Sequence, residues 1–223
     1  MDGNHKYSSI AYWDKRFESE KEYEWVADFD QFSSLLINSL KPTDRILHVG
    51  CGNSKLSQHL YELGFKNITN LDFSPVLIQK GKECDKRFSW VCDDMRTLSN
   101  IPTSSFDVVL EKAAIESLTT RDKSYWSPSE QTLSDLEGIF SSVLRVLKSE
   151  GKFLSISFSQ PHFRIPHMLK HERWSIGVET FGHNFHFFFY TATKGTSSSL
   201  QIISKYRNFL EKSPVKKPPH IVI

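Results

Sequence analysis

Two glycines, Gly50 and Gly52, stand in a short loop between an apolar stretch and a more polar stretch of the chain. The loop, residues 50–54, reads Gly-Cys-Gly-Asn-Ser. Glycines at such a point let the backbone approach a ligand, and the start of the following helix favours negative charge. A tight turn without a ligand would use the same residues. A dinucleotide-binding loop would have a third glycine where Lys55 stands, so the loop does not favour a nicotinamide cofactor.

Acidic residues stand at the ends of the next two predicted strands. Asp72 follows the glycine loop by about twenty residues, where a carboxylate can accept hydrogen bonds from ribose hydroxyls. It would equally serve as a cap for the helix that begins near Pro75. Asp94 and Met95 follow the third strand, where an acid can bind an adenine amino group and an apolar side chain can cover the ring. Together with the loop, these residues indicate a site for an adenosine-containing ligand.

The elements that position these residues are strands and helices in alternation. The predicted strands are 45–49, 68–72, 89–92, 106–111 and 151–158, and the predicted helices are 54–63, one that starts at Ser74-Pro75, and 130–147. Such alternation predicts a parallel sheet with helices on both faces.

The last two predicted strands, 174–180 and 185–193, are separated by only four residues. This gap is too short for a parallel crossover, so they should form an antiparallel hairpin. The prediction is a doubly wound, Rossmann-like α/β fold, with a seven-strand, mostly parallel sheet in three α/β/α layers and a C-terminal antiparallel hairpin. The domain is predicted over 1–195, with 196–223 as a poorly packed tail.

Two further helices are predicted before the sheet. Over 9–18, Trp13 and Phe17 share one helical face with Ile10, and a second helix runs from Asp28 to Leu40. The residues before Trp25 are rich in acids, which argues against a mitochondrial transit peptide. These acids are Asp2, Asp14, Glu18, Glu20, Glu22 and Glu24.

The composition of the chain argues against several classes of function. The 223 residues suit one domain, with 39% hydrophobic and 24% charged residues, and the net charge of +2 gives no argument for nucleic acid or a membrane surface. No apolar run approaches the ~20 residues of a spanning helix. The three cysteines lack metal-ligand spacing, and His183 and His186 have no further ligand cluster, so no metal is expected. We expect a cytoplasmic monomer that binds neither nucleic acid nor membrane.

Several motifs together resemble the class I (seven-β-strand) S-adenosylmethionine-dependent methyltransferases, and most specifically those that methylate lysines of translation elongation factor 1A. The motifs are Val-Gly-Cys-Gly-Asn-Ser at 49–54, Leu-Asp-Phe-Ser at 71–74, Ser-Phe-Asp-Val-Val-Leu-Glu-Lys at 105–112, Tyr-Trp-Asp-Lys-Arg-Phe at 12–17 and Pro-His-Phe-Arg at 161–164. The resemblance covers roughly residues 9–195. Three departures are His48, where many class I enzymes have an acid, Phe17 in place of a tyrosine, and the residues before Glu116.

The resemblance implies S-adenosylmethionine as the cofactor. With Gly52 from the loop, the implied donor-binding residues are Trp13, Phe17, Trp25, Gly50, Asp72, Phe73, Asp94, Met95 and Lys112. A sulfonium cation is attracted to aromatic faces, which gives the N-terminal aromatics a role. Core packing is the alternative for those aromatics.

The resemblance also implies a lysine as the methyl acceptor. Glu111 and Glu116, at and beyond the end of the fourth strand, are the candidate catalytic residues that orient the amine or receive its proton, or they form a structural salt bridge. Residues 119–129 are the candidate rim for a protein substrate, which the resemblance implies to be elongation factor 1A. Alternatives are another protein lysine, as in citrate synthase, a small molecule, or donor binding by a scaffold without catalysis.

Overall fold

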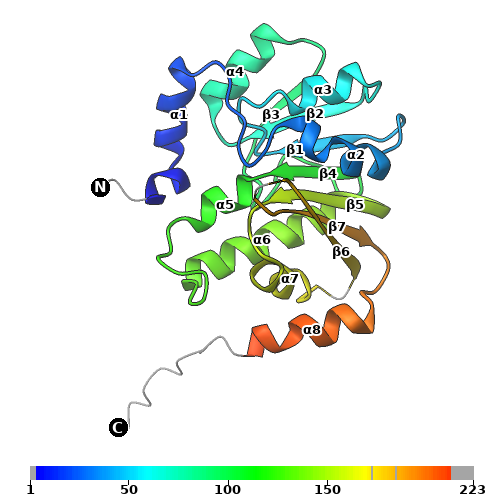
Figure 1. Ribbon diagram of the computed structural model, residues 1–223. Helices are drawn as coiled ribbons and strands as arrows, with labels where there is room; N and C mark the ends of the chain where they lie inside the picture. Colours follow the sequence, from blue (N-terminus) through cyan, green and yellow to red (C-terminus); the bar gives the residue numbers. More distant parts are fainter. Residues whose placement is uncertain (1–3, 172, 184, 212–223) are drawn as a thin grey trace.

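The sheet has seven strands in the order β3-β2-β1-β4-β5-β7-β6. This computed structural model describes residues 4–171, 173–183 and 185–211. Helices cover both faces of the sheet (Figure 1), so the predicted doubly wound α/β fold is confirmed. The strands are β1 Ile46–Val49, β2 Ile68–Asp72, β3 Ser89–Cys92, β4 Phe106–Lys112, β5 Leu147–Ser157, β6 Trp174–Phe181 and β7 Phe187–Lys194.

The helices in the described part of the chain are the 3₁₀ helix η1 Asn4–Ser8 and the α-helices α1 Ile10–Ser19, α2 Phe29–Ser39, α3 Leu56–Glu62, α4 Pro75–Cys84, α5 Ala114–Thr119, α6 Glu130–Val146, α7 Pro161–Met168 and α8 Leu200–Glu211. Four of them were not predicted from the sequence: η1, α5, α7 and α8.

The parallel strands bring their carboxyl ends to one edge of the sheet. Val49 at the end of β1 pairs with Leu71 on one side and with Glu111 on the other. Strand order reverses at this point, because β2 and β3 lie on one side of β1 and β4 and β5 on the other. A crevice at such a reversal is where open α/β sheets bind their ligands.

The C-terminal hairpin is confirmed. β7 lies between β5 and β6 and is antiparallel to both. The turn contains Gly182 at φ +96°, a backbone conformation that residues other than glycine rarely adopt.

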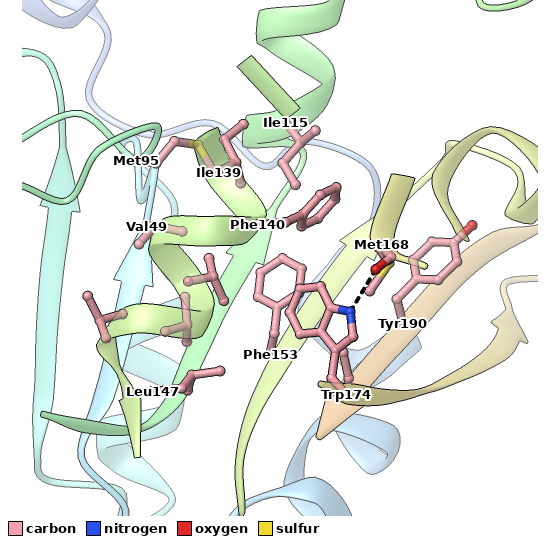
Figure 2. Packing of buried hydrophobic residues seen from close by; sticks show 14 of the residues in the cluster. Val49, Met95, Ile115, Ile139, Phe140, Leu147, Phe153, Met168, Trp174 and Tyr190 are labelled. Carbon is pink, nitrogen blue, oxygen red and sulfur yellow. Dashed lines mark hydrogen bonds between the residues drawn. The ribbon is translucent and has the colours of Figure 1, made fainter. Parts of the chain in front are cut away.

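Two hydrophobic clusters hold the helices on the sheet. On one face, the rings of Phe153 and Trp174 stack at 6.2 Å and the indole Nε1 of Trp174 donates to the carbonyl oxygen of Met168 at 2.8 Å (Figure 2). Phe140 of α6 completes this packing. On the other face α2 and α3 pack on the sheet through residues such as Leu36. Both faces of the sheet are therefore buried, as a parallel sheet requires.

The prediction of a poorly packed tail from residue 196 is wrong for residues 200–211. These residues form α8, which packs against α7, and the side chain of Tyr206 is only 6% exposed. Residues 212–223 lie outside the described part of the chain. The placement of the domain boundary at residue 195 stays a prediction.

Candidate active site

The N-terminal segment, residues 4–28, folds back over the carboxyl ends of the strands; we call it the cover. Its helix α1 lies beside α4 (Figure 1). Trp13 and Phe17 are buried against Leu77 of α4 and Cys51 of the glycine loop. The rings of Trp13 and Phe17 stack at 5.5 Å, and Trp25 approaches Trp13 edge-on at 5.9 Å. The predicted aromatic face of the first helix is therefore directed at the glycine loop.

Glu24 fastens the cover to the sheet. Its carboxylate accepts hydrogen bonds from the Ser54 hydroxyl at 2.9 Å, the Lys55 amide at 2.7 Å and the Lys112 ammonium at 2.5 Å. Lys112 also donates to the carbonyl oxygen of Trp25 at 2.9 Å. Burial raises the pKa of Glu24, but the hydrogen bond and the positive charge of Lys112 lower it, and the net effect is a lowered pKa. Glu24 is thus a charged anchor beside the loop.

Further contacts fasten the cover to α4 and to the loop. The Ser74 hydroxyl donates to Asp14 at 2.5 Å, and the Lys80 ammonium donates to the carbonyl oxygen of Phe17 at 2.5 Å. The Asn53 amide donates to Glu20 at 3.0 Å. The cover therefore contacts β4, α4 and the glycine loop.

A cavity of about 330 Å³ lies between the cover and the strand ends. All ten predicted donor-binding residues line it: Trp13, Phe17, Trp25, Gly50, Gly52, Asp72, Phe73, Asp94, Met95 and Lys112. These residues come from the cover, the glycine loop and the ends of the strands. The structure thus brings the predicted set together around one space.

The two loop glycines have different structural roles. Both have positive φ, +58° for Gly50 and +52° for Gly52. A Cβ on Gly50 would lie 2.3 Å from the Cβ of Ala114, so this glycine allows α5 to approach the loop. A Cβ on Gly52 would meet nothing nearer than the Phe17 ring at 4.0 Å. The space beside Gly52 is therefore free for a ligand between the loop and the cover.

Asp72 presents a buried carboxylate to the cavity. It accepts hydrogen bonds from the backbone amides of Gly52 and Ser74, both at 3.0 Å. Burial raises its pKa to about 6 despite these bonds. The cap of α4 is Ser74, whose hydroxyl accepts from the Leu77 amide at 3.2 Å. A carboxylate can accept about four hydrogen bonds, so Asp72 keeps acceptor capacity for a ligand hydroxyl.

Asp94 and Met95 also line this space, just after β3, the strand that pairs with the end of β2 at Asp72. Asp94 accepts hydrogen bonds from the guanidinium and the backbone amide of Arg96, and the closest approach of the two side chains is 2.5 Å. Burial raises the pKa of Asp94, but the bonds from Arg96 lower it overall. Met95 is 7% exposed. Arg96 thus holds an ionised carboxylate beside an apolar surface.

Glu111 and Glu116 belong to a buried ion cluster with Arg164. Arg164 of α7 pairs with Glu116 and lies 3.6 Å from Glu111. Ser155 and Ser157 donate hydroxyl hydrogen bonds to Glu111 and Glu116 respectively. The structural salt bridge, which the sequence left open as the alternative to a catalytic role for these two residues, is therefore present.

The two carboxylates differ in their access to the cavity. Glu116 lines it, whereas Glu111 does not. Burial, and then the negative charge of Glu116, raise the pKa of Glu111 to about 8. One oxygen of each carboxylate has no hydrogen-bond partner among the described residues. Of the two predicted catalytic residues, only Glu116 can meet a substrate in the cavity.

Aromatic side chains form the predicted rim. The Trp126 side chain is 66% exposed, and its ring stacks on His162 at 5.2 Å and meets Phe163 edge-on at 4.8 Å. Tyr125 packs on Phe163 at 5.5 Å. Residues 119–129 and the start of α7 thus form one surface.

The sequence does not single out two charged residues of the site, Glu24 and Arg164. Glu24 is one of several N-terminal acids, and Arg164 belongs to a motif of the family resemblance. Their partners are Lys112 and Glu116, which lie 88 and 48 residues away in the sequence. No local pattern signals pairs at such separations.

The described residues contain no group of three or more His, Cys, Asp or Glu side chains that could hold a metal ion. None of the helices in the described ranges is both long and apolar enough to cross a membrane.

Comparison with known proteins identifies the family. Residues 47–155 match a methyltransferase domain. The chain is 36% identical to EEF1A lysine methyltransferase 4 of Mus musculus over 96% of this chain and 87% of that protein. The chain belongs to the EEF1A lysine methyltransferase family. It is an S-adenosylmethionine-dependent protein-lysine methyltransferase.

Two other similarities are more distant. The eEF1A lysine and N-terminal methyltransferase of Homo sapiens is 34% identical over 70% of this chain, but this matches only 22% of that protein. A solved SAM-dependent methyltransferase from Methanosarcina mazei superposes with a TM-score of 0.53 at 19% identity, covering 72% of this chain and 96% of that one. The superposition with the Methanosarcina mazei protein shows that the two proteins share a fold.

The cavity of this methyltransferase fits its cofactor. S-adenosylmethionine has a ribose, an adenine, a sulfonium and an amino-acid end. The free space beside Gly52, the buried acceptor Asp72 and the apolar Met95 suit the adenosine part. The aromatic rings of the cover suit a sulfonium cation.

Proposed function

We propose that this methyltransferase transfers a methyl group from S-adenosylmethionine to a lysine side chain of translation elongation factor 1A. The observation that carries the proposal is its 36% identity to a named EEF1A lysine methyltransferase along nearly the whole of both chains. A cavity lined by every predicted donor-binding residue supports it.

The proposed donor contacts follow the lining of the cavity. Asp72 accepts hydrogen bonds from the ribose hydroxyls. Asp94 binds the adenine amino group and Met95 covers the ring. Lys112 binds the carboxylate of the donor. Trp13, Phe17, Trp25 and Phe73 surround the donor with aromatic surface, and Gly50 and Gly52 let the loop backbone approach it.

The accepting lysine must be neutral before it attacks. Its free pKa of ~10.4 means that deprotonation near pH 7.4 costs roughly 4 kcal/mol. When bound, S-adenosylmethionine would supply a methyl group on a positively charged sulfur. The neutral lysine nitrogen would bond to the methyl carbon in line as the bond from that carbon to sulfur breaks, so that neutral S-adenosylhomocysteine is the leaving group. A positive charge and a low dielectric both lower the pKa of a neighbouring ammonium. Alignment and exclusion of water, which the cover provides, contribute the rest of the catalysis.

Glu116 is the proposed catalytic residue of the chain, because it lines the cavity. Its carboxylate orients the lysine ammonium and accepts its proton. Glu111 lies behind it, off the cavity, and acts as a positioning residue through Arg164. The Ser157 hydroxyl donates at 2.5 Å to the same oxygen of the Glu116 carboxylate that Arg164 contacts. The cluster thus holds one carboxylate at a constant place beside the methyl group.

The exposed rim of Trp126, Tyr125 and Phe163 is the proposed contact surface for the folded protein substrate. The net charge of +2 gives no strong electrostatic steering, so recognition depends on shape and local contacts. Elongation factor 1A acts in translation, so the proposed site of action is the cytoplasm. The monomeric state and the absence of nucleic-acid and membrane binding stay predictions.

The deciding experiment compares purified elongation factor 1A with purified citrate synthase, each incubated with labelled methyl donor. We expect label on elongation factor 1A and much weaker labelling by an Asp72→Ala variant. Label on citrate synthase alone, or on neither protein, would overturn the substrate proposal. Label in a dialysable product would instead favour a small-molecule acceptor. Donor binding without transfer to any protein would favour a scaffold.

A further inference from the structure

An aromatic residue stands where the donor cavity opens to solvent. Phe158 directly follows β5 and lines the cavity, yet it is 39% exposed. A residue that borders both the cavity and the solvent marks an opening between them. Phe158 belongs to none of the three hydrophobic clusters formed by residues of the described ranges. Packing of the core therefore does not account for this side chain.

Hydrogen bonds hold the backbone on both sides of Phe158. The Ser157 hydroxyl accepts from the Ser159 amide at 2.8 Å and donates to Glu116 at 2.5 Å. The carbonyl oxygen of Ser159 accepts from the hydroxyl of Tyr190, a fully buried residue, at 2.5 Å. A side chain on such a rigid support loses little entropy when it binds a ligand.

The Ser157 contact also joins the segment of Phe158 to a carboxylate inside the cavity. Glu116 is 3% exposed and lines the same cavity as Phe158. Ser157 and Arg164 both contact one oxygen of this carboxylate. The other oxygen has no hydrogen-bond partner among the residues that the structure describes. The cavity wall therefore has an aromatic ring at its mouth and a free acceptor oxygen farther inside.

The chain continues from Phe158 directly to the exposed rim. α7 begins at Pro161, and its residues His162 and Phe163 contact the Trp126 ring at 5.2 Å and 4.8 Å. The segment 158–163 thus runs from the mouth of the cavity to the surface proposed to contact the protein substrate.

A lysine side chain is complementary to this arrangement. Its methylene chain packs on apolar surface, and its ammonium is attracted to an aromatic face. Beyond the ring, the free oxygen of Glu116 can accept a charge-assisted hydrogen bond from the same ammonium. A lysine of a protein that binds at the rim would pass Phe158 before it reaches Glu116.

We propose that Phe158 is a specificity-determining residue that binds the acceptor lysine at the mouth of the cavity, with the methylene chain against its ring and the ammonium directed to Glu116. This rests on the proposed transfer to a lysine of elongation factor 1A and adds the contact that selects the acceptor. Ser157 and Tyr190 are positioning residues, because they act only by holding the backbone beside the ring.

Steady-state kinetics on elongation factor 1A with saturating labelled donor measure this contact. Phe158→Ala should lower kcat/KM about five- to thirtyfold, the range for a cation–π contact at a partly to fully desolvated site. Phe158→Tyr, which keeps the ring, should recover most of the loss, and Phe158→Leu, which keeps only apolar surface, should recover less. Calorimetry with S-adenosylhomocysteine should show the affinity of the parent protein for all three variants.

Phe185→Ala is the matched control, because Phe185 is 64% exposed but does not line the cavity. It should leave kcat/KM unchanged. A photo-crosslinking phenylalanine analogue at position 158 should attach to the segment of elongation factor 1A that carries the labelled lysine. The same analogue at position 185 should not.

An unchanged kcat/KM of Phe158→Ala would overturn the role of Phe158, as would equal activity of Phe158→Leu and Phe158→Tyr. A loss of S-adenosylhomocysteine affinity as large as the loss of kcat/KM would also overturn it, because the ring would then contact the donor. If the parent protein itself does not label elongation factor 1A, the proposed substrate is wrong and this role is overturned with it.

Discussion

The ammonium of Lys112, the last residue of β4, lies 2.5 Å from the carboxylate of Glu24, which precedes the whole sheet in the chain. The Lys112 side chain is 2% exposed and the Glu24 side chain 24%. The same carboxylate also binds Ser54 and Lys55 of the glycine loop and α3 cap. One acidic residue therefore joins the cover, the loop and the central strand.

Glu24→Gln should weaken donor binding by about 1–3 kcal/mol, because the amide cannot neutralise the buried Lys112. The cover should also become more sensitive to proteolysis, while the sheet stays folded. Calorimetry with S-adenosylhomocysteine and limited proteolysis measure the two effects. Glu22→Gln is the matched control, since Glu22 pairs with Lys55 at the surface and such pairs contribute little. Equal behaviour of the two variants would contradict the role of Glu24.

Asp72→Ala should weaken donor binding by about 1.5–3 kcal/mol, the range for hydrogen bonds to a charged group. Calorimetry on the folded variant measures this, and unchanged affinity would remove Asp72 from the ribose site.

Donor affinity should also depend on pH through Asp72. Its pKa is about 6 in the folded protein against 3.8 for the free side chain, so the folded state favours the protonated form. The contribution of Asp72 to folding stability is therefore lost as pH rises from about 4 through about 6. The ribose hydroxyls favour the ionised form, so donor affinity should fall as pH drops below about 6. Asp72→Asn should remove this step from the affinity profile.

Arg164→Leu should destabilise the fold by about 3–5 kcal/mol, because it leaves Glu111 and Glu116 buried without a counter-charge. This loss of folding stability should grow with pH. In the parent protein the pKa of Glu111 is raised from 4.5 to about 8 by folding, so its ionisation already lowers stability as pH rises between these values. Without Arg164 the ionised form has no counter-charge, so the same rise in pH should cost more. Urea denaturation at pH 5 and pH 8 measures both effects. Lys148→Gln, which removes a more exposed pair with Asp107, should change stability by less than about 1 kcal/mol.

Trp126→Ala should raise the KM for the protein substrate while donor affinity and folding stability stay unchanged. The ring is 66% exposed and does not line the donor cavity. Phe185→Ala provides the control, because Phe185 is 64% exposed but lies next to the hairpin strand β7. Steady-state kinetics on elongation factor 1A separate KM from kcat. If both variants raise KM equally, the rim does not bind the substrate.

Local patterns predicted the strands well and the short helices poorly. β2 and β3 have the predicted bounds, because short runs that contain β-branched or aromatic residues between turn residues favour a strand. α5 begins after Ala113 at φ +61°, which no sequence rule expects of alanine. α8 is stabilised by packing on α7, itself not predicted, so its presence depends on tertiary contacts.

The residues of the site also differ in how far the sequence predicts them. Residues at strand ends and in the glycine loop could be placed from spacing, because parallel strands end at a common edge. The cover residues Trp13, Phe17 and Trp25 needed the family resemblance, since helical spacing alone equally predicts core packing. The partners of Glu24 and Arg164 could not be predicted, because they are brought together only by the folded chain.

The cover forms one wall of the donor cavity, yet none of its described residues belongs to a strand of the sheet. It is held to α4, β4 and the loop by contacts that each involve a side chain, and two of these, Glu24 with Lys112 and Glu22 with Lys55, are ion pairs. Detaching such a segment requires far less free energy than unfolding the domain. We therefore expect local opening of residues 4–28, rather than unfolding of the domain, to set the residence time of a bound donor or product.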